Sequence, residues 1–179
     1  VHEGMVTVGG SEGIDLTMRA MLNPGDEVLV PEPSYVSYAP CVTLADGVPV
    51  PIPMKEENEF KLTAEELEAA ITPKTKILVL PFPNNPTGAI MTKEDLEPIA
   101  KLVEKYDLYV LSDEIYSELT YKTEHVSIAS LPGMRERTLV VNGFSKGLAM
   151  TGWRLGYICG PQIIMEQMVK IRQYAILCA

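Results

Sequence analysis

The chain has 179 residues, 46% of them hydrophobic, which is enough to bury the core of one ordinary domain. Its 24 acidic and 15 basic residues give a formal net charge of −9, which argues against a nucleic-acid or anionic-membrane surface. No apolar run approaches the length of a membrane span.

Cysteines and histidines offer no obvious chemistry. Cys41, Cys159 and Cys178 lie far apart, so they predict neither a disulfide framework nor a metal site, and they suit a reducing, cytoplasmic compartment. His2 and His125 are isolated, and we expect each to be solvated or to cap a local segment.

Both ends of the sequence look like cuts. The chain begins at Val1 without an initiator methionine or a signal peptide, and it stops inside the amphipathic pattern QYAILCA. We therefore expect a piece of a longer protein.

Strand-like and helix-like segments alternate along the chain. After a β-like stub in TVGGSEG (7–13), the helical pattern 11–22 precedes strands at 27–31 and 47–53, the second with prolines that suit a sheet edge. Helices at 63–71 and 92–105 open with capping-box spacings, Thr63 to Glu66 and Thr92 to Asp95. Further strands are predicted at 74–83, 107–113, 137–144 and 154–160, and a last helix runs over 161–177.

This alternation is typical of an α/β domain, and runs that are apolar on both faces indicate a mostly parallel sheet covered by helices, a three-layer α/β/α fold. We see no internal repeat, linker or low-complexity tract. Ligands of such sheets bind beyond the carboxyl ends of the strands.

Polar groups follow several of the predicted strands. GGSEG, at Gly9, Gly10 and Ser11, opens a helix, whose free N–H groups suit an anion, although a plain turn would have the same sequence. Asn85, in LPFPNNPTG, could donate to an oxygen on a bound ring if its loop faces the cleft.

Acidic and aromatic residues follow the strand at 107–113. Asp113 lies at its end, where a carboxylate could hold a protonated ring nitrogen, and Tyr116 could return toward the same place. Glu114 should point away from Asp113, because successive side chains of a strand face opposite sides.

Two cations follow the strand at 137–144. Lys146 is a candidate nucleophilic amine, because a lysine partly withdrawn from water has a lowered pKa. Arg154 has a planar, charged guanidinium group that suits phosphate. Taken singly, each would be read as a solvated surface residue. Together with the other strand ends they match an aromatic aldehyde that carries a phosphate and a basic ring nitrogen, which is pyridoxal phosphate.

At these residues the chain resembles the large, cofactor-binding domain of the class I/II aminotransferases, of the aspartate aminotransferase fold type. The resemblance covers nearly the whole chain and rests on GGSEG, NPGDEVLVPEPSYVSY, NNPTG, SDEIY and FSKGLAMTGWRLGY. It implies that residues 1–179 are an incomplete large domain, which lacks the N-terminal segment and the C-terminal small domain.

The resemblance also implies a role for each site residue. Lys146 matches the Schiff-base lysine and proton shuttle, and Asp113 matches the carboxylate that pairs with the ring nitrogen. Asn85 and Tyr116 match the pair that binds the ring hydroxyl, and Tyr35 matches the aromatic that stacks on the ring. The phosphate would be held by Gly9, Gly10, Ser11 and Arg154, with Ser145 partly replacing a serine that many relatives carry where this chain has Gly143.

The implied function is amino-group transfer between an L-amino acid and a 2-oxo acid, in a cytoplasmic homodimer without a metal. Three alternatives stay open at this point: a carbon–sulfur β-lyase on the same scaffold, the effector domain of a transcription regulator, and an inactive truncated domain. The motifs do not identify the amino acid, because the segments that would recognise it lie outside the sequence.

Overall fold

A computed structural model describes residues 3–175 of the chain. Seven strands form one sheet in the order β1-β7-β6-β5-β4-β2-β3. The strands are β1 (Gly4–Thr7), β2 (Glu27–Glu32), β3 (Val48–Pro53), β4 (Thr75–Leu80), β5 (Tyr109–Asp113), β6 (Thr138–Gly143) and β7 (Gly156–Cys159). All neighbouring pairs from β6 to β3 are parallel, whereas β7 runs antiparallel to both β6 and β1. The sheet is therefore mostly parallel, as predicted, and its proline-rich strand β3 lies at an edge.

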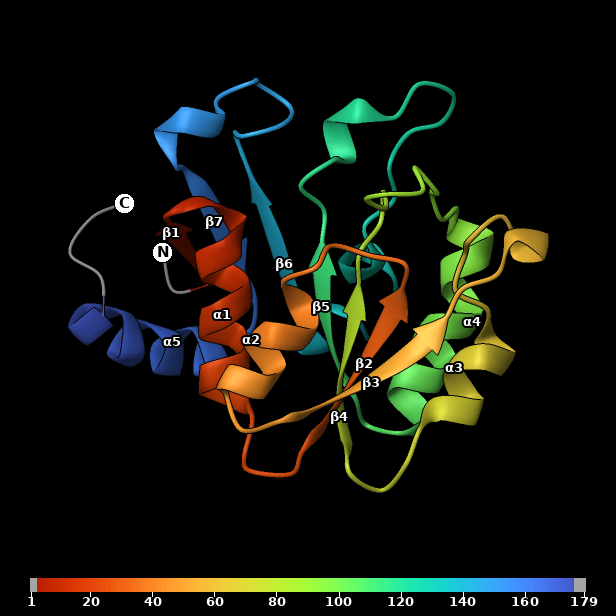
Figure 1. Ribbon diagram of the computed structural model, residues 1–179, viewed down its shortest axis with the longest axis horizontal. Coiled ribbons are helices and arrows are strands. Elements are labelled where there is room, and N and C mark those ends of the chain that lie inside the picture. Colours follow the sequence, from red (N-terminus) through yellow and green to blue (C-terminus); the bar gives the residue numbers. More distant parts are fainter. Residues whose placement is uncertain (1–2, 176–179) are drawn as a thin grey trace.

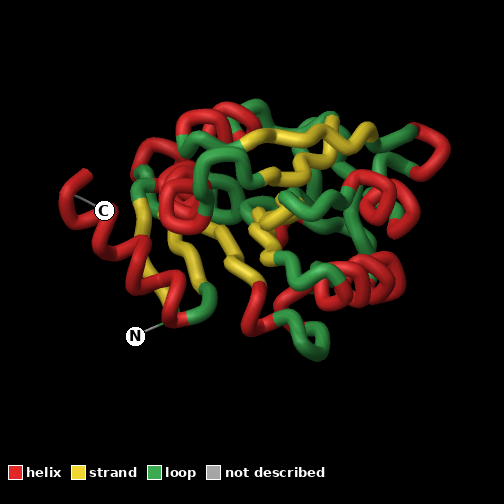
Figure 2. Tube along the Cα trace, turned by 90° about the horizontal axis from the view of Figure 1, so that it is seen from below, coloured by secondary structure: helices red, strands yellow, loops and turns green. Residues whose placement is uncertain are grey.

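Helices cover both faces of this sheet, as Figures 1 and 2 show. The helices are α1 (Gly9–Met21), α2 (Tyr38–Leu44), α3 (Ala64–Ala70), α4 (Lys93–Lys105) and α5 (Gln162–Ala175). One core cluster joins α1, α2 and α5 to the sheet, and a second joins α3 and α4 to the opposite face. The predicted three-layer α/β/α arrangement is confirmed.

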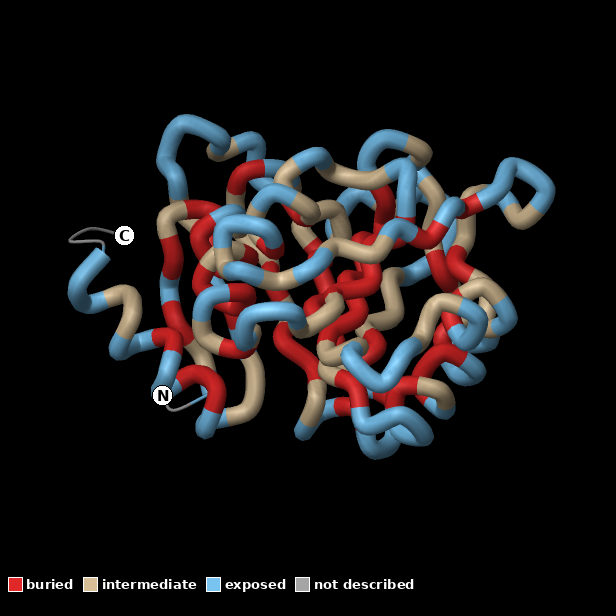
Figure 3. Tube along the Cα trace, turned by 60° about the horizontal axis from the view of Figure 1, so that its bottom comes forward, coloured by how far each residue is buried: buried red, intermediate tan, exposed pale blue. Residues whose placement is uncertain are grey.

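Alternating side chains of the central strands supply the two cores. In β4, Ile77 and Val79 belong to the cluster under α1, while Leu78 and Leu80 belong to the cluster under α4. All four are buried, because a parallel strand covered on both sides has no solvent face. In Figure 3 the buried stretches accordingly lie in the interior, and the exposed ones are the outer loops and outer helix turns.

Local signals set the helix starts. The capping boxes predicted at Thr63 and Thr92 are both present, and each threonine hydroxyl accepts a hydrogen bond from the backbone N–H three residues later. Helix α2 was not predicted, because YAPCVTL is short and contains a proline and two β-branched residues. It forms because Tyr38 and Val42, one turn apart, are buried in the core cluster under α1.

Candidate functional site

A cavity of about 260 Å³ opens at the carboxyl ends of β4, β5 and β6. In Figure 1 these ends point to the top of the view, beside the N-terminal end of α1. Every site residue predicted from the sequence lines this cavity except Gly9: Gly10, Ser11, Tyr35, Asn85, Asp113, Tyr116, Ser145, Lys146 and Arg154. Side chains from distant parts of the chain thus meet at one place, as expected for a parallel sheet.

Gly9 does not line the cavity but adjoins two residues that do, Gly10 in the sequence and Arg154 in space. It has a positive φ of 70°, and a Cβ there would lie only 2.5 Å from Nη2 of Arg154. The turn also packs on β7, since a Cβ on Gly156 would lie 2.6 Å from the carbonyl carbon of Gly9. Only glycines permit this approach. It brings the Arg154 guanidinium to the first N–H groups of α1, an arrangement that suits an anion.

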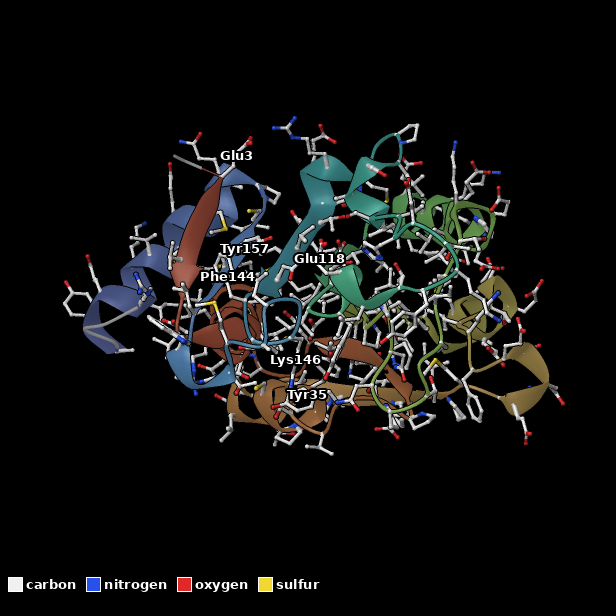
Figure 4. All side chains as sticks on the ribbon, turned by 90° about the horizontal axis from the view of Figure 1, so that it is seen from above. Glu3, Tyr35, Glu118, Phe144, Lys146 and Tyr157 are labelled. Atoms are coloured by element: carbon white, nitrogen blue, oxygen red, sulfur yellow. The ribbon has the colours of Figure 1, made fainter. Side chains whose placement is uncertain are left out.

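Lys146 and Tyr116 form the side of the cavity nearest the loop after β6. The Nζ atom of Lys146 lies 5.8 Å from the centroid of the Tyr116 ring. Figure 4 shows Lys146 close to Tyr35, which lines the same cavity. Lys146 is exposed, so the expectation that it is partly withdrawn from water is wrong for the described chain. Lys146 thus lines the cavity while exposed to solvent, whereas the adjacent Ser145 is buried.

Asp113 lies deeper and is only 7% exposed. Its Oδ1 accepts a hydrogen bond from the backbone N–H of Ile115 (3.2 Å), and its Oδ2 accepts one from the Tyr38 hydroxyl (2.7 Å). Burial raises the pKa of the Asp113 carboxyl, while the bonds from Tyr38 and Ile115 act in the opposite direction. In the described part of the chain no cation pairs with this carboxyl.

Tyr38 is the functional residue that the sequence analysis missed. Its ring is buried and meets the Tyr35 ring edge-on, with centroids 5.7 Å apart. Burial, followed by the nearby Asp113, raises the pKa of the Tyr38 hydroxyl well above its ordinary value, so the group stays a donor. The available signal was the three-residue spacing in SYVSY, which suits a turn: the Tyr38 N–H donates to the Tyr35 carbonyl (3.4 Å), just before α2 begins.

The loop after β4 brings Asn85 to the cavity. Asn85 itself is exposed, and the loop is shaped by its neighbour Asn84, whose Oδ1 accepts hydrogen bonds from the N–H (3.1 Å) and hydroxyl (2.8 Å) of Thr87. The turn chemistry of NNPTG is thus used to present Asn85 at the cavity.

Glu114 makes contacts separate from those of Asp113, as predicted. Its carboxylate is buried and lies within 2.8 Å of His125 Nε2. The expectation that His125 is solvated or caps a local segment is therefore wrong, because its side chain is only 18% exposed and binds the Glu114 carboxylate. It failed because the partner is eleven residues away and belongs to the end of a strand.

The remaining sequence expectations concern metals, membranes and cysteines. Within residues 3–175 no group of three or more His, Cys, Asp or Glu side chains could hold a metal ion. The helices described are all too short or too polar to cross a bilayer. Cys41 is half-buried and Cys159 exposed, and among residues 3–175 neither is bonded to another cysteine. His2 and Cys178 lie outside the described residues.

Comparison with known proteins gives a consistent result. Residues 3–179 match the family described as aminotransferase class I and II. The chain is 51% identical to an aspartate aminotransferase of Pyrococcus abyssi and 50% identical to aromatic-amino-acid aminotransferase 2 of Thermococcus litoralis, over 98% and 97% of its length. It superimposes on a crystal structure of an aromatic aminotransferase from Pyrococcus horikoshii with a TM-score of 0.95 and 51% identity, covering 97% of this chain. These matches span 46%, 45% and 47% of the three relatives, about half of their length.

Proposed function

Because the chain belongs to the class I and II aminotransferase family, we propose that it is the cofactor-binding large domain of a pyridoxal-phosphate-dependent aminotransferase. The observation that carries the proposal is the convergence of Lys146, Asp113 and Arg154 on one cavity. The domain is incomplete in this proposal, since its relatives are about twice as long.

The residues present fit the cofactor. A protonated ring nitrogen would supply the positive partner for the buried Asp113 carboxyl. The phosphate suits the α1 N-terminus and Arg154, where the close approach of Gly9 keeps side-chain atoms out of the way. Asn85 and Tyr116 can donate to the ring hydroxyl, and the Tyr35 ring can stack on the cofactor plane.

Bound pyridoxal phosphate supplies an aldehyde that condenses with amines and a ring that accepts the electron pair of a broken Cα–H bond. The chain's own part is to hold and to move protons. Lys146 would be the base that takes the proton from the substrate Cα and returns it to C4′ of the cofactor. Asp113 favours the protonated ring nitrogen, and Tyr38 fixes the orientation of Asp113 through its hydrogen bond.

The partners follow from this reaction. An L-amino acid gives up its amino group and leaves as a 2-oxo acid, and a second 2-oxo acid takes the group in the reverse half. We propose a cytoplasmic homodimer for the whole protein. The relatives named above are aminotransferases, which favours amino transfer over the lyase and regulator alternatives.

The test is covalent labelling of the chain with added pyridoxal phosphate. After borohydride reduction and peptide mapping, we expect one equivalent of label on Lys146 and a pH-sensitive visible band before reduction. Lys146→Ala should abolish both. Lys122→Ala, which removes an exposed lysine away from the cavity, should keep both. Label scattered over surface lysines would refute the assignment of Lys146.

A further inference from the structure

We propose that Glu114 is a positioning residue: together with Ser112, His125 and Ser127 it forms a buried clasp that holds Tyr116 beside Lys146. The inference rests on the proposed function, because Tyr116 matters there as the donor to the cofactor ring. The segment that the clasp closes, residues 114–127, is called the Tyr116 loop below.

The clasp is centred on a buried carboxylate, with Ser112 buried and His125 and Ser127 half-buried around it. Glu114 is 4% exposed, and its Oε1 accepts hydrogen bonds from the hydroxyls of Ser112 (2.9 Å) and Ser127 (2.6 Å). Its Oε2 accepts one from Nε2 of His125 (2.8 Å). A buried carboxylate needs such partners, because burial without them is costly. One side chain at the end of β5 thus binds both the strand and the far end of the Tyr116 loop.

The clasp extends into the following element. The Ser127 hydroxyl also accepts a hydrogen bond from the N–H of Ala129, at the start of the short 3₁₀ helix Ile128–Ser130. Ile128 is buried in the core cluster under α4. The C-terminal end of the loop is therefore anchored in the core, and Glu114 ties the N-terminal end to the same anchor.

Between its ends the Tyr116 loop has little support of its own. It contains a single 3₁₀ turn at Ser117–Leu119, and Tyr121 at its tip is 93% exposed. Two contacts bind its first half to the Lys146 side of the cavity. Asn142 of β6 donates to the Ser117 hydroxyl (3.1 Å), and the Glu118 side chain packs on Gly147, where an added Cβ would lie 3.1 Å away.

Tyr116 lies between these fixed points. It follows Glu114 by two residues, and the Ser117 N–H after it donates to the Glu114 carbonyl (2.9 Å). In Figure 4, Glu118 and Lys146 lie along the same side of the molecule, in line with the Glu118–Gly147 contact. The Glu114 N–H donates to the Val141 carbonyl (2.9 Å) and Ile128 stays in the core, so opening the clasp removes the side-chain link between the two ends of the loop and not the ends' own anchors. The turn that carries Tyr116 then becomes freer to move. Asp113 and Glu114 thus have different roles: Asp113 faces the cavity, and Glu114, on the opposite side of the strand end, fixes the Tyr116 loop.

The experiment compares Glu114→Gln and His125→Gln with Glu124→Gln, which changes an exposed carboxylate of the same loop. The first readout needs no cofactor: nitration of Tyr116 by tetranitromethane, measured against the exposed Tyr121, and amide hydrogen exchange of residues 114–127. We expect both rates at the Tyr116 loop to rise about tenfold in the first two variants, as for the loss of one hydrogen bond to a charged group. Exchange in β4 and β5 should stay unchanged.

The second readout is the pH midpoint of the visible band formed with pyridoxal phosphate. We expect it to shift in Glu114→Gln and His125→Gln and to stay in place in Glu124→Gln. Unchanged nitration and exchange at the Tyr116 loop would overturn the clasp. A loosened loop with an unmoved pH midpoint would overturn the positioning role. Failure of the unmodified chain to label at Lys146 would instead count against the proposed function, while the cofactor-free readouts still decide the clasp.

Discussion

Replacing Tyr38 with phenylalanine isolates one hydrogen bond of the site. The change removes only the hydroxyl that donates to Oδ2 of Asp113 at 2.7 Å and leaves the buried ring in place. Asp113 is then left with the Ile115 N–H as its remaining hydrogen-bond donor among the described residues. A buried acceptor that loses its donor carries the full cost of desolvation.

The size of the effect follows from the charge of the acceptor. A hydrogen bond to a charged group contributes about 1.5–3 kcal/mol, and a loss of about 2 kcal/mol lowers the Tm of a chain of this length by about 4–8 °C. The effect must also depend on pH. The pKa of Asp113 is raised on folding, so its ionisation destabilises the fold as the pH rises through the folded-state pKa. Without the Tyr38 hydroxyl that pKa rises further, and the penalty of Tyr38→Phe is therefore larger at pH 8 than at acidic pH.

Denaturant unfolding of the chain near pH 4, close to the ordinary carboxyl pKa of 3.8, and at pH 8 measures the size of the penalty and its dependence on pH. Tyr121→Phe is the matched control, because it removes the hydroxyl of a tyrosine that is 93% exposed, and it should leave stability unchanged at both pH values. A penalty for Tyr38→Phe that equals that of the control, or that grows toward acidic pH, would refute the reasoning.

Two further changes test the helix start and the glycine contact. Thr92→Ala removes a capping box and should cost about 1 kcal/mol in the free energy of unfolding, whereas Thr123→Ala, in an exposed loop, should cost little; equal losses would contradict the capping argument. Gly156→Ala places a methyl group against the backbone of Gly9 and should weaken pyridoxal phosphate binding about tenfold or more. Gly152→Ala, where the new methyl group meets nothing within 4 Å, is its control in a spectral titration, and unaltered affinity in Gly156→Ala would show that the turn tolerates displacement.

Most of the fold could be predicted because its signals are local. The apolar runs of β4 and β5 and the capping boxes at Thr63 and Thr92 are each read from a few neighbouring residues. Helix α2 was missed because its intrinsic propensity is poor and its stability comes from burial of Tyr38 and Val42. The antiparallel pairing of β1 with β7 joins the two ends of the chain, and no local pattern reports such a contact.

The cavity-lining residues could be predicted for a related reason. Topology brings the ends of parallel strands together, so residues such as Asp113 and Lys146 can be collected without knowing any distance. The contacts that support these residues could not be predicted from the sequence. The hydrogen bond from Tyr38 to Asp113 joins residues 75 positions apart, and the bond from His125 to Glu114 joins a loop residue to the end of a strand eleven positions earlier. The exposure of Lys146 likewise depends on what packs above it, which strand patterns do not encode.

The strand order has a consequence for how this chain responds to a ligand. The cavity draws on residues from Gly10 to Arg154, carried by α1, by α2 and the segment before it, and by the loops after β4, β5 and β6, so the complete site exists only when all of these elements are assembled. A ligand held there binds only the assembled sheet. At a concentration one hundred times its Kd it would add about 2.7 kcal/mol to the unfolding free energy of the whole domain. Titration with a ligand of the cavity therefore also measures how cooperatively the domain unfolds. Protection from amide hydrogen exchange should rise together in β2 and β6, which lie toward opposite edges of the sheet, and not only in the loops that touch the ligand.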